Sequence, residues 1–168
     1  GVTTGEIDRA VRSFIQSKGA IPSFLGYGGF PGSACVSVND EIIHGIPGGR
    51  VIQEGDIVSI DVGAIVDGYH GDNAATFAAG RVSDAAQKLM DATRESLLAA
   101  IAVAKPGARL GDIGYAVQSY VEALGYGVVR EYVGHGIGRK MHESPEVPNF
   151  GAPGHGPRLL RGMTIAVE

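Results

Sequence analysis

The chain has 168 residues and a formal net charge of −4, and 44% of its residues are hydrophobic. This length predicts one domain, residues 1–168, and the hydrophobic content excludes intrinsic disorder. No basic patch dominates the sequence, so nucleic-acid binding is disfavoured. Glycine is in excess, with 27 residues, whereas the usual share is about 7%. The chain is therefore expected to be rich in turns.

The only cysteine, Cys35, cannot form an internal disulfide bond, which favours a reducing compartment such as the cytoplasm. The longest nearly apolar run covers residues 97–104, whereas a membrane-spanning helix needs about 20 such residues. The sequence therefore predicts a cytoplasmic protein with no membrane partner. No initiator methionine stands at Gly1, so we expect further residues before it.

The first predicted element is a helix that begins at Thr3. Thr3 and Glu6 have the spacing of a capping box, and apolar residues follow at helical intervals until Gly19, a typical helix-ending residue. A glycine-rich loop is expected next, over residues 26–32, and a short strand over residues 34–38.

A hairpin is predicted next. Residues 57–66 and 69–78 have the character of strands, and Asp67 and Gly68 between them form a two-residue turn signal.

Two helices follow, over residues 83–104 and 110–124, each with an apolar stripe. Residues 128–133 are expected to form a strand, residues 134–158 to be irregular, and residues 163–167 to be strand-like. Strands and helices that alternate around antiparallel pairs indicate the α+β class. The order of the elements also hints at two similar halves.

Two carboxylates in the predicted hairpin give the strongest chemical signal. If Asp67-Gly68 is the turn, Gly63 lies opposite Asp72 and Asp61 lies opposite Ala74. Because side chains alternate along a strand, Asp61 and Asp72 then point to the same face as diagonal neighbours, about 7–8 Å apart at the backbone. Gly63, which lies between them, is expected to leave room there.

Two like charges in apolar strands repel each other and lose hydration, and a divalent cation would compensate for both costs. Alternatively, both carboxylates reach solvent at the end of a strand, or they pair with arginine. The apolar surroundings of Asp61, in IVSIDVGAIV, favour the cation.

Histidines supply further candidate ligands. His135 lies in Gly134-His135-Gly136, where small neighbours allow the imidazole to approach a metal or ligand closely. His142 follows seven residues later, which is not the spacing of a helical zinc site. His70 is expected on the opposite strand face from Asp72, and His155 in an exposed or structural position, so neither is predicted to be a ligand.

Several loop residues have a structural and a functional interpretation. Tyr27, Phe30 and Met141 are bulky apolar residues that either pack in a core or form the wall of a pocket. Cys35 followed by His44 could suggest a thiol nucleophile, but a single cysteine beside a strand is more often a small packed residue. The glycine-rich loops lack the spacing of phosphate-binding motifs.

Five segments in order along the chain resemble the bacterial type I methionine aminopeptidases, a family of pita-bread metallopeptidases. The segments are GYGGFPGSACVSVNDEIIHGIPGG, GDIVSIDVGAIVDGYHGDNAATF, KPGARLGDIG, VVREYVGHGIGRKMHESPEVPNF and RGMTIAVE. The stretch N-D-E-x-x-H-G-I-P distinguishes this family from prolidases and other pita-bread enzymes.

The resemblance implies a pita-bread fold, with a central antiparallel sheet, flanking helices and pseudo-two-fold halves. It also implies hydrolysis that removes the N-terminal methionine from nascent proteins with two divalent metal ions, either Mn, Fe, Co or Zn. Four residues would bind the metals, namely Asp61, Asp72, His135 and Glu168, with Asp72 as a bridge between the two ions.

The resemblance implies roles for further residues as well. His44 and His142 would contact the substrate and stabilise the transition state, and Glu168 could also accept the proton of the attacking water. The pocket for the methionine side chain would be lined by Tyr27, Phe30, Cys35, His44 and Met141.

The family has a further bridging glutamate and further strands beyond the position of Glu168, so we expect this chain to lack the C-terminal strands. The expected partners are the N-terminal segments of nascent polypeptides and the surface of the ribosome, and the expected state is a monomer. Two alternatives stay open. One is an inactive pita-bread scaffold that binds protein or RNA, and the other is a related dipeptidase.

Overall fold

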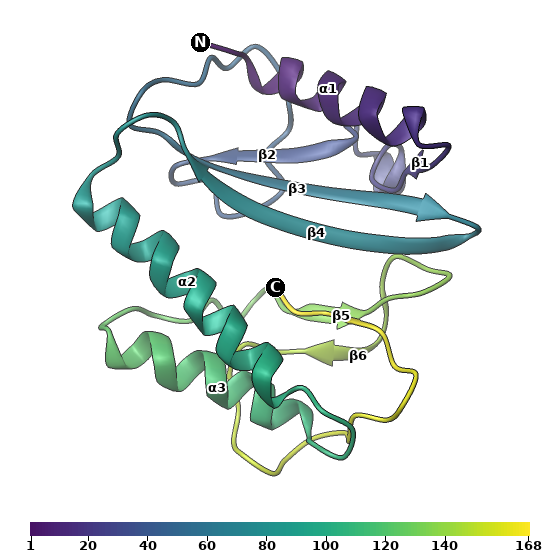
Figure 1. The fold of residues 1–168 in the computed structure, drawn as a ribbon, viewed down its shortest axis with the longest axis vertical. Helices are drawn as coiled ribbons and strands as arrows, with labels where there is room; N and C mark the ends of the chain where they lie inside the picture. The colour runs from purple at the N-terminus through teal and green to yellow at the C-terminus, as the bar shows by residue number, and fades with distance from the viewer. The chain divides into compact units, whose positions relative to one another are not determined.

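The computed structural model describes all residues, Gly1–Glu168. They form two compact units, Gly1–Gln87 and Lys88–Glu168. Figure 1 shows the elements of both units in chain order, and each unit is described here by itself. None of the helices combines the length and the apolar character that crossing a membrane requires.

The first unit begins with helix α1, Thr4–Ser17, and its capping box is confirmed. The backbone N–H of Glu6 donates to Thr3 Oγ1 at 3.1 Å, and the backbone N–H of Thr3 donates to Glu6 Oε2 at 2.7 Å. The helix ends before Gly19, which has a positive φ of 72°. Such a conformation suits glycine because it has no Cβ.

A four-stranded antiparallel sheet forms the centre of this unit. Its strands are β1, Ile21–Pro22; β2, Ala34–Val38; β3, Ile57–Val66; and β4, Tyr69–Ala78. Strand β3 pairs with β4 along one edge and with β1 and β2 along the other. A short 3-10 turn, η1, covers Tyr27–Gly29 between β1 and β2.

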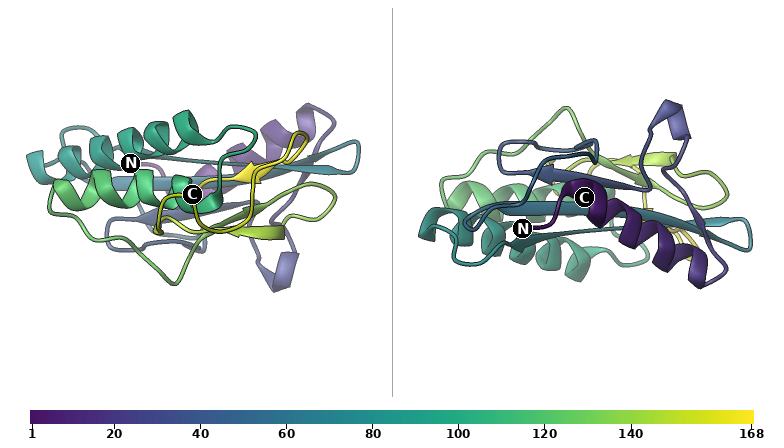
Figure 2. Two further views of the ribbon diagram at one scale, coloured as in Figure 1. Left: turned by 90° about the horizontal axis from the view of Figure 1, so that it is seen from below. Right: turned by 90° about the horizontal axis from the view of Figure 1, so that it is seen from above.

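One face of this sheet is apolar and the other carries carboxylates, because side chains alternate between the two faces along each strand. One face carries the core of the unit, over which α1 lies (Figures 1 and 2). This core contains Ala34, Val36, Val38, Ile52 and Val58, with Ile7 and Val11 of α1 and Ile60 and Val62 of β3 packed against it. The opposite face carries the candidate metal ligands Asp61 and Asp72.

The second unit contains most of α2, Asp84–Val103, together with α3, Leu110–Ala123, and a three-stranded antiparallel sheet. The strands of this sheet are β5, Gly134–Gly136; β6, Glu143–Val147; and β7, Ile165–Ala166, with β5 in the middle. Figure 2 shows α2 and α3 next to each other in the view from below. Their core contains Ala100, Leu110, Ile113, Val117, Val147 and Leu159.

Two expectations for this unit are wrong. Residues 128–133 form no strand, and residues 134–158 are not all irregular, because β5 and β6 lie within them. The glycines of β5 explain the error, since they suggest a loop but here allow close approach of the neighbouring strands. A Cβ on Gly134 would lie 2.2 Å from the carbonyl oxygen of Ala166 in β7.

Candidate metal centre

The β3–β4 hairpin holds Asp61 and Asp72 in the expected register. Gly63 pairs with Asp72 and Asp61 pairs with Ala74, so both carboxylates lie on the same face of the sheet as diagonal neighbours. Both residues are intermediate in exposure, and Asp61 Oδ1 is fully shielded from solvent. Two partly buried anions on one face are the arrangement that a cation would stabilise.

The space at Gly63 is filled rather than left open. A Cβ at this position would lie 2.6 Å from Phe24 Cε1 and 2.8 Å from Ser23 Cβ. The segment after β1 therefore crosses this face of the sheet, where the backbone N–H of Ser23 donates to the carbonyl oxygen of Gly63 at 2.9 Å. Glycine is required here because the side chains of Ser23 and Phe24 occupy the space that a Cβ would need.

The thiol of Cys35 is buried beside the two carboxylates. Cys35 is buried on β2 and pairs directly with Asp61 of β3. Burial, with the negative charges of Asp61 and Asp72, raises the pKa of Cys35 to about 12. The thiol therefore stays protonated near neutral pH, which argues against a thiolate nucleophile and agrees with its interpretation as a packed residue.

The position expected for His70 is wrong. Strand β4 pairs with β3 in register and without a bulge, so residues two apart share a face, and His70 lies on the same face as Asp72. Its Nδ1 is 3.0 Å from Ser23 Oγ. Because side chains alternate along a strand with a period of two, the sequence alone should have placed His70 on the same face as Asp72.

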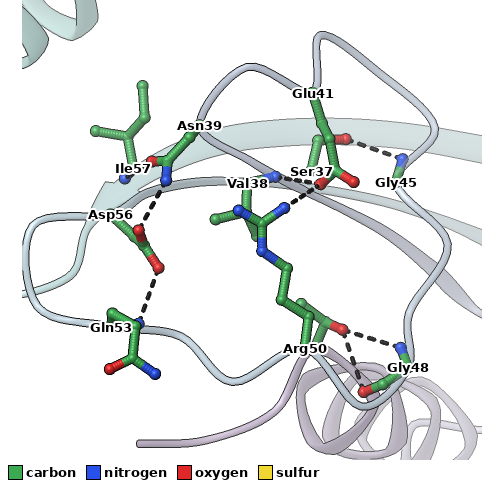
Figure 3. A network of polar contacts seen from close by, with 11 residues as sticks. Ser37, Val38, Asn39, Glu41, Gly45, Gly48, Arg50, Gln53, Asp56 and Ile57 are labelled. Atoms are coloured by element: carbon green, nitrogen blue, oxygen red, sulfur yellow. Dashed lines mark hydrogen bonds and ion pairs between the residues drawn. The ribbon is translucent and has the colours of Figure 1, made fainter.

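His44 lies in the long loop between β2 and β3, which several polar contacts hold (Figure 3). His44 itself is exposed and adopts a positive φ of 58°, an uncommon conformation for a residue other than glycine. The next residue, Gly45, is buried and bonds to β2 through both of its backbone groups. The loop is therefore fixed at the position from which His44 projects.

In the second unit, His135 and Glu168 meet. His135 Nε2 lies 2.9 Å from Glu168 Oε1, and its Nδ1 lies 2.8 Å from the carbonyl oxygen of Gly136. Because a carbonyl only accepts hydrogen bonds, Nδ1 carries the proton, and the lone pair of a neutral ring is then on Nε2. Two electron-pair donors face each other at that point, and either a proton or a metal ion stabilises them. Metal-binding histidines commonly donate their other N–H to a backbone carbonyl in this way.

His142 contacts His135 of this pair, and Met141 is its neighbour in the chain. The rings of His142 and His135 are in edge-to-face contact, with their centroids 4.4 Å apart. Met141 is buried, in contrast to the solvent-exposed side chain of Tyr27 in the first unit. Phe30, at the end of η1, is half-buried.

The donor atoms of each unit fit divalent metal ions. The first unit offers two carboxylates on one face, and the second offers an imidazole lone pair beside a carboxylate. Oxygen and nitrogen donors of this kind bind Mn, Fe, Co and Zn ions.

The sequence matches a family model for metallopeptidase family M24 over residues 1–168. The chain therefore belongs to this family of metal-dependent hydrolases. Its carboxylate and imidazole donors and its antiparallel sheets agree with this membership. Family membership implies divalent metal ions as cofactors.

The chain is similar to methionine aminopeptidase from Clostridium acetobutylicum, with 57% identity over 169 residues. It is also similar to methionine aminopeptidase 1 from Bacillus subtilis, with 54% identity over 168 residues. Each comparison covers 100% of this chain and 68% of the relative.

Solved structures agree on the fold. A crystal structure of methionine aminopeptidase from Rickettsia prowazekii matches with a TM-score of 0.97 and 45% identity, covering 99% of this chain and 67% of that one. An Xaa-Pro dipeptidase from Bacillus anthracis matches with a TM-score of 0.83 and 28% identity, covering 100% of this chain and 45% of that one. The chain therefore has the expected α+β pita-bread fold, with antiparallel sheets and flanking helices.

Proposed function

We propose that the protein is a methionine aminopeptidase, which removes the N-terminal methionine from nascent polypeptides with two divalent metal ions. The observation that supports this most directly is the set of donors in both units, combined with 57% and 54% identity to methionine aminopeptidases over the whole chain. The metal ligands in this proposal are Asp61, Asp72, His135 and Glu168. Asp72 would be shared by both ions.

The bound ions would activate a water molecule and polarise the scissile carbonyl group. The protein groups then have separate tasks. Glu168 would accept a proton from the attacking water, and His44 would donate a hydrogen bond to the oxyanion that develops at the carbonyl. His142 would hydrogen-bond the peptide and hold it in place.

The pocket for the methionine side chain would be formed by Tyr27, Phe30, Cys35, His44 and Met141. A protonated thiol and a buried thioether are soft, apolar neighbours for another thioether. The high pKa of Cys35 supports this role, because a thiolate would be a poor neighbour for an apolar side chain.

Hydrolysis of the peptide Met-Ala-Ser tests the function. The metal-free protein should release no methionine, and added Mn, Fe, Co or Zn should restore release, with the rates showing which metal is used. Absence of metal-dependent release would contradict the proposal. If the same protein instead cleaved an Xaa-Pro dipeptide, a dipeptidase would be indicated, and binding of peptide without any cleavage would indicate an inactive scaffold.

We also propose a single catalytic domain that acts as a monomer in the cytoplasm, where nascent chains leave the ribosome. The single cysteine supports the reducing compartment. Sedimentation of the purified protein with ribosomes at low and high salt tests the ribosome contact, and its sedimentation alone gives the oligomeric state.

A further inference from the structure

Strand β2 has a second task besides pairing with β3, because it also fixes the backbone beside His44. The buried Ser37 accepts a hydrogen bond at its Oγ from the backbone N–H of Gly45, at 3.0 Å. The carbonyl oxygen of Gly45 in turn accepts the backbone N–H of Val36 at 2.9 Å. Both backbone groups of Gly45 are thus bonded to one strand.

Only glycine allows this contact. A Cβ on Gly45 would lie 2.3 Å from the carbonyl oxygen of Val36 and 2.7 Å from Ser37 Cα. The loop backbone therefore lies directly against β2, and the residue before it, His44, leaves this point with a φ of 58°. Such a left-handed conformation persists only where the surroundings fix it.

Contacts on either side of Gly45 limit how the loop can relax. Glu41 accepts the backbone N–H of Val38 at 2.8 Å and pairs with Arg50 at 3.2 Å. Farther along, Gly48 exchanges hydrogen bonds with the hydroxyl of Thr4 at the start of α1. Figure 3 shows the Ser37, Glu41 and Gly48 contacts along this loop.

The register of the sheet links this anchor to the carboxylates. Ser37 lies two residues after Cys35, so it shares the face that carries Asp61, and it pairs with Ser59 of β3. The same rigid strand therefore sets the position of the Gly45 anchor relative to the carboxylate face.

From these contacts we propose that Ser37 is a positioning residue for His44. This inference rests on the proposed function, in which His44 stabilises the transition state. Without the Ser37 hydroxyl, the N–H of Gly45 loses its partner in a buried place, and the backbone that aims the imidazole is released. Ser37 itself touches neither the substrate nor the metal ions.

The test compares Ser37→Ala with the matched control Ser59→Ala in steady-state cleavage of Met-Ala-Ser. Ser59 lies opposite Ser37 on the same face, but its hydroxyl bonds to Thr76 on β4 at 2.8 Å rather than to the loop. We expect Ser37→Ala to lower kcat about tenfold, as for one lost hydrogen bond to a buried group, with little change in KM. Ser59→Ala should leave both nearly unchanged.

A double-mutant cycle separates positioning from general destabilisation. In a His44→Ala background, Ser37→Ala should have almost no further effect on kcat, because the group that it positions is gone. If the two substitutions instead lower kcat independently, or if Ser37→Ala matches Ser59→Ala, the inference is overturned. An unaltered protein that releases no methionine at all would contradict the proposed function rather than this inference.

Hydrogen exchange of the unaltered protein provides a test that does not depend on a variant folding. The amide of Gly45 should exchange much more slowly than those of the exposed residues around it in the loop. An equally fast exchange would mean that the anchor does not hold in solution, and the inference would be wrong.

Discussion

Asp72 is the residue at which the sequence and the structure give the same interpretation for the same physical reason. Its place opposite Gly63 depends only on the two-residue turn and on the period of two, and both are local properties of the hairpin. The proposed bridging role makes Asp72 the best single position at which to test metal binding.

We predict that Asp72→Asn weakens binding of Mn²⁺ by more than about tenfold, since even groups that only support a ligand are worth roughly 10- to 100-fold in affinity. Calorimetric titration of the metal-free protein measures this. Asp67→Asn is the matched control, because it removes the same charge from the turn of the same hairpin, at a left-handed position that asparagine tolerates. Equal affinities for the two variants would show that the proposed site is wrong.

Other residues could not be placed from the sequence alone. The contact between Ser37 and Gly45 joins a strand to a loop eight residues later, and neither position carries a recognised motif. His135 and Glu168 were grouped only through the family resemblance, since no local pattern predicts that residues 33 apart approach to 2.9 Å when β5 and β7 pair. Contacts of this kind depend on tertiary packing, which no local pattern specifies.

Elements with strong local signals were predicted correctly, and the weak ones were not. The capping box of α1 and the Asp67-Gly68 hairpin use short-range hydrogen bonds that a few residues determine. Strand β5 has only three residues, two of them glycine, and exists because neighbours pair with it on both sides. Residues 128–133 have the composition of a strand but no partner strand, so the composition was misleading there.

Helix α3 shows how an element end is held by a distant segment. The loop around Gly154 packs against the first turn of this helix. The backbone N–H of Gly154 donates to Asp112, and the carbonyl oxygen of His155 accepts a hydrogen bond from the backbone N–H of Gly111. A Cβ on Gly111 would lie 2.2 Å from the carbonyl oxygen of Ala152, so loop and helix are in backbone contact. His155 is thus structural in its backbone, which agrees with the expectation from the sequence.

Hydrogen bonds from the backbone N–H groups of Arg109 and Gly154 lower the pKa of Asp112 below its usual value of 3.8. A group with a lowered folded-state pKa contributes stability above its unfolded pKa, and this contribution is lost as the pH falls through the folded value. We therefore expect Asp112→Asn to lower the melting temperature at pH 6 and to matter progressively less below pH 3.8. Thermal unfolding of Asp112→Asn and of the unaltered protein, at pH 6 and below pH 3.8, measures the difference between their melting temperatures.

Asp40→Asn is a suitable comparison for this pH series, because it removes a carboxylate from an exposed loop and no helix end. Its effect should be small at every pH. A difference between Asp112→Asn and the unaltered protein that did not change with pH would mean that the carboxylate charge does not hold the loop at the helix end.

At the scale of the whole molecule, the proposed ligands are divided between the two compact units. Asp61 and Asp72 belong to Gly1–Gln87, and His135 and Glu168 belong to Lys88–Glu168. A ligand that binds the folded state stabilises whatever it binds, by about 2.7 kcal/mol at a hundredfold excess over Kd. Because each unit contributes proposed ligands, metal binding should stabilise each of them.

Hydrogen exchange with and without Mn²⁺ measures whether metal binding stabilises each unit. We expect slower exchange on metal addition both in the β3–β4 hairpin and in β5. Protection confined to one unit would show that the metal binds there alone and that the divided ligand set is wrong. Mg²⁺ at the same concentration gives a useful comparison, because it demands near-ideal octahedral geometry and dehydrates reluctantly.

The alternation along β2 and β3 has a practical consequence for anyone who mutates this protein. Even-numbered positions such as Val36, Val38 and Val58 face the core under α1, whereas odd-numbered positions such as Cys35 and Asp61 face the carboxylate side. Within these strands, the parity of a residue number therefore predicts which face its substitution alters. Changes at even positions should appear in unfolding experiments, and changes at Cys35 or Asp61 in metal affinity and turnover. Two odd positions are exceptions, because the hydroxyl of Ser59 bonds to Thr76 away from the loop and Gly63 leaves no space for a Cβ. A library of odd positions that keeps Gly63 could therefore vary the chemistry of the sheet while leaving its core intact.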